Sequence, residues 1–365
     1  MSRAPILIMA GGTGGHVYPA LAIADEFLDR GQPVIWLGTT RGLESRVVVE
    51  QGIPMEWLTI SGLRGRGAIG WLLAPFRISL AIVRSLRIMR RIRPRLVIGM
   101  GGFVSGPGGI AARLMRIPLV IHEQNAAAGM TYRWLARIAT RVLLGFEGAI
   151  AGARTVGNPV RANIRSIASP DRRFTGRQGA LRLLVIGGSQ GALALNEWVA
   201  PAVALLAEDS VQFDVRHQAG PATLEPAQDR YAQHRVRAEV TPFIDDMAQA
   251  LSWADLIVCR AGALTVSELI NVGLGAVFVP LPTAVDDHQT RNARALVNAE
   301  AALVIQQHGM DAQSLAAAIR SLGTDRDALL DRAQKARALR GPDAVSLVVA
   351  QCAELLEDPA LEAVS

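Results

Sequence analysis

Two glycine-rich segments lie about half a chain apart, and each directly follows an apolar run. The first is ILIMAGGTGGH at residues 6–16, and the second is LRLLVIGGSQGA at residues 181–192. A glycine loop between a strand and a helix presents backbone N–H groups to an anion at the positive end of the helix. The sequence therefore predicts two anion-binding loops.

The first loop adds two reactive side chains, the Thr13 hydroxyl and the His16 imidazole. Histidine titrates near neutral pH, which suits a general base or a phosphate contact, although His16 could also simply start a helix. The loop lacks the G-x-G-x-x-G register, and the next strand ends at residues 37–40 without an acid, which disfavours NAD. A Walker A loop is excluded because the single lysine is Lys335.

Two more strand ends carry glycines or polar groups. MGGFVSGPGG at residues 100–109 is glycine-rich, and HEQN at residues 122–125 follows. So many glycines cost chain entropy, which favours close approach of a ligand over a plain tight loop. Glu123 and Asn125 could then read a sugar hydroxyl.

The second half offers a carboxylate and several amides. RAGALTVSE at residues 260–268 follows an apolar run, and Glu268 could accept hydrogen bonds from a ribose diol or simply complement the helix dipole. DDHQTRN at residues 286–292 lacks the Asp-x-Asp spacing of a metal site. We expect a metal-free site in which helix ends and Arg161 meet the pyrophosphate charge.

Residues 57–122 hold 11 arginines and no acid. On a helical wheel one face is apolar, and it comprises Ile78, Ile82, Leu86 and Met89. The opposite side carries Arg77, Arg84, Arg87 and Arg91. The same side would also carry Ile69, Leu72, Leu73 and Phe76, unless Pro75 interrupts the helical periodicity. Apolar residues beside arginines favour an anionic membrane surface, with a core helix whose basic face is solvated as the alternative. A nucleic-acid-binding protein is a weaker reading because aromatic residues are not interleaved.

Short apolar runs alternate with helical patterning in two successive series, which predicts two doubly wound α/β domains with a boundary at residues 160–180. The first series of predicted strands is 6–9, 34–37, 96–100, 119–121 and 142–144. The second is 183–186, 213–217, 236–240, 256–259, 276–279 and 303–305. Cys259 and Cys352 make no disulfide framework, and we expect no signal peptide, no spanning helix and a reducing compartment.

Taken together, GGTGGH, GGFVSGPGG, HEQN, GNPVR at residues 157–161, GGSQGA and RAGALTVSE resemble the MurG family in order and spacing. This family transfers N-acetylglucosamine from UDP-N-acetylglucosamine to lipid I, which gives lipid II in peptidoglycan synthesis. The resemblance implies a GT-B fold, an α/β architecture of two Rossmann-like domains facing across a cleft. Residues 1–160, joined by a C-terminal helix at 342–358, would take the acceptor and the membrane, and residues 161–341 would bind the UDP-sugar.

The resemblance also implies the site residues. The donor contacts would be Thr13, Gly14, Gly15, Asn125, Arg161, Ser189, Ile244, Ala263, Leu264, Thr265, Val266, Ser267, Glu268 and Gln289. Glu268 would hold the ribose, and the Ile244 backbone would hold the uracil. His16 is the expected catalytic base and Glu123 the second choice, in an inverting displacement that uses no metal or cofactor.

The family's partners would be UDP-N-acetylglucosamine, lipid I and an anionic membrane surface, on the cytoplasmic face of the inner membrane as a peripheral protein. Nucleic acid is not expected, and other cell-wall synthesis proteins stay open as partners. A UDP-N-acetylglucosamine 2-epimerase shares the two-domain architecture and is the nearest alternative enzyme. It would not need a basic and apolar surface patch.

Overall fold

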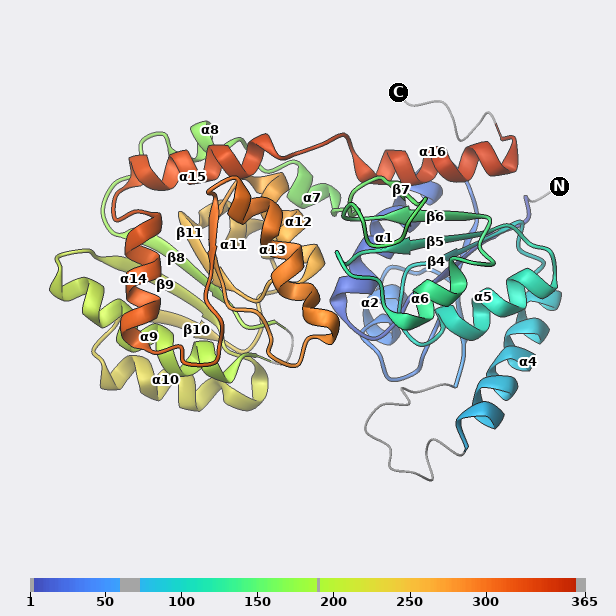
Figure 1. The fold of residues 1–365 in the computed structure, drawn as a ribbon, viewed down its shortest axis with the longest axis horizontal. Coiled ribbons are helices and arrows are strands. Elements are labelled where there is room, and N and C mark those ends of the chain that lie inside the picture. Colours follow the sequence, from blue (N-terminus) through green and yellow to red (C-terminus); the bar gives the residue numbers. More distant parts are fainter. Residues whose placement is uncertain (1–2, 60–72, 189–190, 359–365) are drawn as a thin grey trace. The chain divides into compact units, whose positions relative to one another are not determined.

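The computed structural model describes residues 3–59, 73–188 and 191–358. The chain divides into two compact units, of which the first comprises Met1–Arg161 with Gly341–Ser365 and the second Ala162–Arg340. Each unit is an α/β structure built on one parallel sheet (Figure 1). The predicted pair of doubly wound domains is therefore confirmed.

The first unit contains a parallel sheet in the order β3-β2-β1-β4-β5-β6-β7. Its strands are β1 (Ile6–Met9), β2 (Val34–Gly38), β3 (Met55–Trp57), β4 (Leu96–Gly99), β5 (Leu119–Glu123), β6 (Arg141–Leu144) and β7 (Arg154–Thr155). The four residues of β1 are fully buried, because helices cover both faces of the sheet.

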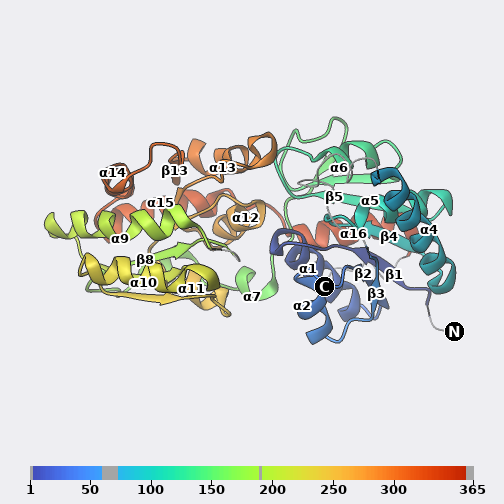
Figure 2. The same ribbon diagram turned by 90° about the horizontal axis from the view of Figure 1, so that it is seen from below.

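In the described part of the first unit, six helices pack on the sheet and form hydrophobic cores with it. They are α1 (Gly14–Asp29), α2 (Glu44–Glu50), α4 (Ala74–Ile92), α5 (Ser105–Leu114), α6 (Met130–Leu135) and α16 (Ala344–Leu356). Ile6 and Ile8 pack with α1 and α16, whereas Leu7 and Met9 pack with α4, α5 and α6 on the other face. This alternation follows from the two-residue period of a strand. Figure 2 gives a second view of the helices and the sheet of this unit.

The second unit repeats this topology with the order β10-β9-β8-β11-β12-β13. Its strands are β8 (Leu181–Ile186), β9 (Phe213–Gln218), β10 (Ala238–Thr241), β11 (Leu256–Cys259), β12 (Gly275–Phe278) and β13 (Ala302–Val304). Its helices include α7 (Ala162–Arg165), α8 (Pro170–Phe174), α9 (Leu193–Glu208), α10 (Leu224–Gln233), α11 (Met247–Trp253), α12 (Ala263–Val272), α13 (His288–Asn298), α14 (Ala312–Leu322) and α15 (Arg326–Ala338).

Each predicted strand is present, with ends that differ by a residue or two. The short strands β3 and β7 were not expected, because they lie beyond the buried centre of the sheet and carry no continuous apolar run. Helix α1 begins at Gly14, within the glycine loop. Pro75 lies in the first turn of α4, where proline is tolerated, so it does not break the helix.

The shared topology places both glycine loops at equivalent points. In the first unit the central strand β1 pairs with β2 and β4, and in the second unit β8 pairs with β9 and β11. The strand order reverses beside β1 and beside β8, and ligands of doubly wound sheets bind at the carboxyl ends of strands at such switch points. The loops after β1 and β8 both lie there.

Candidate active site

The first glycine loop leads directly into α1. Thr13 has an extended conformation at the N-cap, and its carbonyl oxygen accepts the N–H groups of His16 and Val17. The first turn of a helix leaves N–H groups without intrahelical partners, so those of Gly14 and Gly15 can meet an anion. Gly12 has φ +94°, a conformation that favours glycine.

His16 lies where the two glycine loops of the first unit meet. Its Nδ1 atom is 3.4 Å from the Gly11 carbonyl oxygen. A side chain at Gly101, whose φ is +110°, would place Cβ 2.8 Å from His16 Nε2. Gly102 packs on the Gly11 backbone in the same way. Glycine at positions 101 and 102 therefore allows the loop after β4 to close onto the loop that carries the imidazole.

Glu123 binds the loop that follows it. Its Oε1 atom accepts the backbone N–H of Asn125 at 3.0 Å and the Asn125 side-chain amide at 3.2 Å, and Oε2 accepts the Gly129 N–H at 3.2 Å. The side chain is buried. These contacts favour a structural role for Glu123 and a fixed orientation for Asn125, so His16 stays the better candidate for the base.

Buried polar side chains join this region to the end of the first unit. Gln124 donates to the Met100 carbonyl oxygen at 2.9 Å, and Asn158 donates to the Gln124 carbonyl oxygen at 3.0 Å. His122 Nε2 is 2.8 Å from the Gly157 carbonyl oxygen. Burial lowers the pKa of His122 to about 4, so this ring is neutral and anchors the HEQN and GNPVR segments together.

Arg161 is placed in the first unit, beside the helix that begins at Gly14. Its guanidinium lies 4.3 Å from the centre of the Tyr18 ring, a cation–π distance. The predicted contact of Arg161 with a pyrophosphate stays a prediction. The positive charge does lie close to the N-terminus of α1, where Thr13, Gly14 and Gly15 are found.

The second glycine loop is tightly packed. A Cβ at Gly187 would lie 2.6 Å from the Ala192 backbone nitrogen, and one at Gly191 would collide with the Ala219 carbonyl oxygen. Asn196 donates to the same carbonyl oxygen at 3.0 Å. Ser189 lies outside the described residues, so its predicted donor contact stays a prediction.

Helix α12 starts beside this loop, because β11 neighbours β8. Gly262 is its N-cap, and the predicted run from Ala263 to Glu268 forms the first turns. Of this run, Ala263, Leu264, Val266, Ser267 and Glu268 are buried, and Thr265 is half-buried. Glu268 is 6% exposed, so the protein itself largely encloses this residue.

Arg260, just before α12, holds two strand ends together. It donates to the carbonyl oxygens of Val279 and Pro280 at 2.9 and 3.1 Å and to the Gln307 side chain at 2.7 Å. Burial lowers the pKa of this arginine. These hydrogen bonds link the residue after β11 to the residues after β12.

The predicted recognition residues Gln289 and Ile244 lie in different parts of the second unit. Gln289 is in the first turn of α13, and its Oε1 accepts the Leu281 N–H at 2.9 Å, which directs its NH₂ group to other acceptors. Ile244 lines a small pocket of about 190 Å³ together with Thr241, Phe243 and Gln249. This pocket opens at the carboxyl end of β10, as a base-binding site would.

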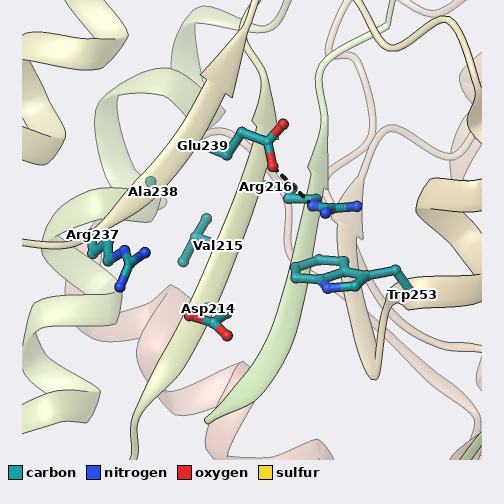
Figure 3. A pocket seen from close by; sticks show the side chains of 7 residues that line it. All are labelled: Asp214, Val215, Arg216, Arg237, Ala238, Glu239 and Trp253. Atoms are coloured by element: carbon teal, nitrogen blue, oxygen red, sulfur yellow. Dashed lines mark ion pairs between the residues drawn. The ribbon is translucent and has the colours of Figure 1, made fainter.

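A larger pocket of about 410 Å³ adjoins it. Its lining includes Asp214, Arg216, Arg237 and Trp253, and the two pockets share the ion pair between Arg216 and Glu239 (Figure 3). The Arg216 guanidinium lies 4.4 Å from the centre of the Trp253 ring. None of the predicted site residues lines this larger pocket.

Helix α4 carries a solvent-exposed face that is both apolar and basic. Phe76, Leu80 and Val83 are 72%, 38% and 41% exposed, while Met89 and Ala81 are buried on the other side. Arg77 and Arg87 are exposed beside the apolar residues. Leu73 precedes the helix, and Ile69 and Leu72 lie outside the described residues. Within the described ranges, no helix is long and apolar enough to cross a membrane.

Two residues that shape the site were not predicted from the sequence. Arg260 was seen as part of a motif without a role, and Glu44 was not considered. Glu44 is fully buried at the start of α2 and accepts the Gly12 N–H at 2.9 Å. A glutamate at the start of a helix is usually read as a favourable charge at the dipole, so the sequence offered no signal for this contact.

Comparison with known proteins agrees with the two-domain fold. Residues 6–144 match the glycosyltransferase family 28 N-terminal domain, and residues 182–348 match the glycosyltransferase family 28 C-terminal domain. The chain is 52% identical to a UDP-N-acetylglucosamine--N-acetylmuramyl-(pentapeptide) pyrophosphoryl-undecaprenol N-acetylglucosamine transferase of Marinobacter nauticus, over 96% of this chain and 98% of that protein. It is 53% identical to the protein of the same name from Alkalilimnicola ehrlichii, with the same coverage.

Solved structures give the same result. The crystal structure of MurG from Acinetobacter baumannii superposes with a TM-score of 0.82 at 41% identity, covering 97% of this chain and 99% of that one. The calicheamicin glycosyltransferase CalG4 superposes with a TM-score of 0.67 at 17% identity, covering 97% of this chain and 98% of that chain. The second likeness concerns the fold alone.

Proposed function

The chain belongs to glycosyltransferase family 28 and, within it, to the MurG family, and from this premise we propose that it transfers N-acetylglucosamine from UDP-N-acetylglucosamine to lipid I. The product is lipid II, the disaccharide precursor of peptidoglycan. The first unit takes the lipid-linked acceptor, and the second takes the nucleotide sugar.

The observation that carries this proposal is the pair of glycine loops at equivalent switch points of two sheets. The loop after β1 brings helix N–H groups and the His16 imidazole to one place. The loop after β8 lies beside the N-terminus of α12 with the buried Glu268. Two anion-binding loops of unequal chemistry suit one diphosphate-linked donor and one diphosphate-linked acceptor.

The proposed reaction is a single inverting displacement. His16 Nε2 takes the proton of the muramoyl 4-hydroxyl, the 4-oxygen attacks the anomeric carbon, and the bond from that carbon to UDP breaks. Negative charge grows on the leaving diphosphate, so fixed N–H dipoles and Arg161 stabilise the transition state more than the ground state. Glu268 accepts from the ribose hydroxyls, and the Ile244 backbone reads the uracil.

The acceptor is anchored in a membrane, and the exposed face of α4 fits such a surface. Phe76, Leu80 and Val83 can enter the interface, while Arg77 and Arg87 meet anionic headgroups. We propose that the protein is peripheral on the cytoplasmic face of the inner membrane, where lipid I is presented. Other cell-wall synthesis proteins stay possible partners.

Transfer of labelled N-acetylglucosamine from UDP-N-acetylglucosamine to a lipid I analogue tests this function directly, with and without a chelator. We expect labelled lipid II in both cases, because the proposed mechanism uses no metal. Formation of UDP-N-acetylmannosamine from the donor alone, without transfer, would indicate the epimerase instead. Absence of transfer by the folded protein with both substrates would contradict the proposal.

A further inference from the structure

We propose that Glu44 is a positioning residue for His16 and that it acts through the peptide group joining Gly11 to Gly12. This inference rests on the proposed transferase function, in which His16 is the base. Glu44 belongs to α2, an element outside both glycine loops, and is separated from His16 by 28 positions in the sequence.

The Glu44 carboxylate is fully buried and accepts three hydrogen bonds. Oε2 accepts the Gly12 N–H at 2.9 Å, and Oε1 accepts the Thr39 N–H at 2.9 Å and the Thr39 hydroxyl at 2.7 Å. A carboxylate is an acceptor only, so three converging donors match its ionised form. Hydrogen bonds to a charged group are stronger than neutral ones, which makes this carboxylate a firm anchor for the loop after β1.

Three glycines make the space for this side chain. A Cβ at Gly11 would lie 2.6 Å from Glu44 Oε1, and one at Gly38 would lie 2.8 Å from Glu44 Cγ. A Cβ at Gly42 would collide with the carboxylate itself. Gly38 ends β2 and Gly11 follows β1, so the ends of two neighbouring strands are shaped around one carboxylate. The lack of side chains at these three positions indicates that the contacts of Glu44 are specific.

One peptide group connects the carboxylate to the imidazole. The Gly12 N–H donates to Glu44, and the Gly11 carbonyl of the same peptide faces His16 Nδ1 at 3.4 Å. An ionised acceptor on the N–H polarises the peptide and makes its carbonyl oxygen a better acceptor. The carbonyl then favours the tautomer that carries the proton on Nδ1, in which Nε2 is the basic nitrogen of the ring.

The proposed role of Glu44 is similar to that of the aspartate in a Ser-His-Asp triad, where a buried carboxylate fixes the tautomer and orientation of the histidine. Here a peptide group is inserted between the two side chains. The contribution of Glu44 is therefore to the protonation pattern and orientation of the base, and not to substrate binding.

Nitrogen-15 NMR of the histidine side chains in the full-length protein without substrates tests the tautomer directly. In the wild-type protein we expect His16 to be neutral with its proton on Nδ1, and in Glu44→Gln we expect a larger share of the Nε2-protonated form. His16→Ala identifies the resonance. A wild-type ring protonated on Nε2, or the same tautomer ratio in a folded Glu44→Gln, would overturn the proposal.

Kinetics supply the second readout. We expect Glu44→Gln to lower kcat by about tenfold or more, the scale typical of groups that orient a reactive ligand, with the donor KM within about twofold of wild type. Glu44→Asp, which keeps the charge but shortens its reach, should recover part of the loss. Glu50→Gln, an exposed change on the same helix, is the matched control and should leave kcat unchanged.

The two measurements separate this inference from the function on which it rests. One outcome is that the wild-type protein transfers no sugar while Glu44→Gln still changes the His16 tautomer. That result would support the link between Glu44 and His16 and refute the transferase proposal. Active transfer with unchanged tautomer and unchanged kcat in Glu44→Gln would refute the link alone. Circular dichroism of each variant confirms that folded protein is compared.

Discussion

At the scale of single residues, the proposed general base is the imidazole of His16. The ring lies between Gly11 and Gly101, and these contacts fix its orientation. It is not packed in the hydrophobic core. We expect His16→Ala to lower kcat by about 10²- to 10⁴-fold, the usual contribution of a general base, with little change in donor affinity. Initial rates at saturating acceptor measure this effect.

The control for that substitution is His308→Ala, because His308 is exposed in the second unit. It should retain wild-type turnover. Near-normal turnover of His16→Ala would remove His16 from the role of base, and Glu123 would then have to be tested despite the three hydrogen bonds that occupy its carboxylate.

Glu268 is proposed to act in donor binding rather than in the chemical step. Loss of a hydrogen bond to a charged group costs about 1.5–3 kcal/mol, so Glu268→Ala should raise the donor KM by about tenfold or more with a smaller change in kcat. Steady-state kinetics with varied UDP-N-acetylglucosamine measure both parameters. Glu225→Ala, an exposed change in the same unit, is the control. An unchanged donor KM in Glu268→Ala would contradict the ribose contact.

Residue types alone predicted the glycine loops, but not the residues from other elements that hold these loops in place. Thr13, His16 and Glu268 could be proposed as site residues because a polar group beside glycines at a strand end is unusual. Glu44 could not, because its partner Gly12 is 32 residues away and the contact depends on the pairing of β1 with β2. Long-range contacts of this kind require the fold before they can be seen.

At the scale of elements, α4 is the helix that we propose binds a membrane surface. Its residues Phe76, Leu80 and Val83 recur at helical spacing on the exposed side, and arginines flank them. Burying one large apolar side chain in an interface is worth about 1.5–3 kcal/mol. The double substitution Phe76→Ser with Val83→Ser should therefore lower binding to phosphatidylglycerol vesicles by about tenfold or more.

Co-sedimentation with vesicles at low and high salt measures this binding. Both the apolar and the basic residues should contribute, so high salt should weaken the binding as well. Leu339→Ser, an exposed apolar change in the second unit, is the matched control. Transfer to a water-soluble acceptor analogue should continue in the double variant, since α4 does not form the loops. Unchanged vesicle binding would contradict a membrane role for this face.

The elements themselves were largely predictable because parallel strands buried on both faces appear as continuous apolar runs. Strands β1, β4, β8 and β11 are of this kind. The exposed strand β7 carries no such run, and α1 begins among glycines that disfavour a helix by propensity. The attachment of α16 also depends on tertiary contacts, such as that of Arg141 on β6 with Gln351.

At the scale of the whole molecule, the chain contains the same sheet topology twice, and each unit encloses one neutral histidine. His122 in the first unit and His217 in the second are fully buried, and burial lowers their pKa values to about 4 and about 3 from the usual 6.5. His122 contacts the Gly157 carbonyl oxygen, and His217 Nδ1 is 2.9 Å from the Tyr231 hydroxyl. Neither site suits an imidazolium.

These histidines make both units sensitive to acid. A histidine with a lowered pKa in the folded state binds more protons when unfolded, so stability is fully present above pH 6.5 and falls as the pH drops toward the folded pKa. For His122 the loss approaches about 3 kcal/mol by pH 4. Hydrogen exchange of the β5 and β9 amides, measured by mass spectrometry between these pH values, follows each unit separately.

A single substitution then distinguishes the two units within one experiment. In His122→Gln the side chain can still donate to the Gly157 carbonyl oxygen but cannot take up a proton, so the acid dependence of protection at β5 should become shallower. Protection at β9 should keep its wild-type dependence, because His217 is unchanged and lies in the other unit. Equal slopes at β5 in wild type and variant would show that acid sensitivity of the first unit arises from other groups. A change at β9 as well would show that the two units do not unfold independently.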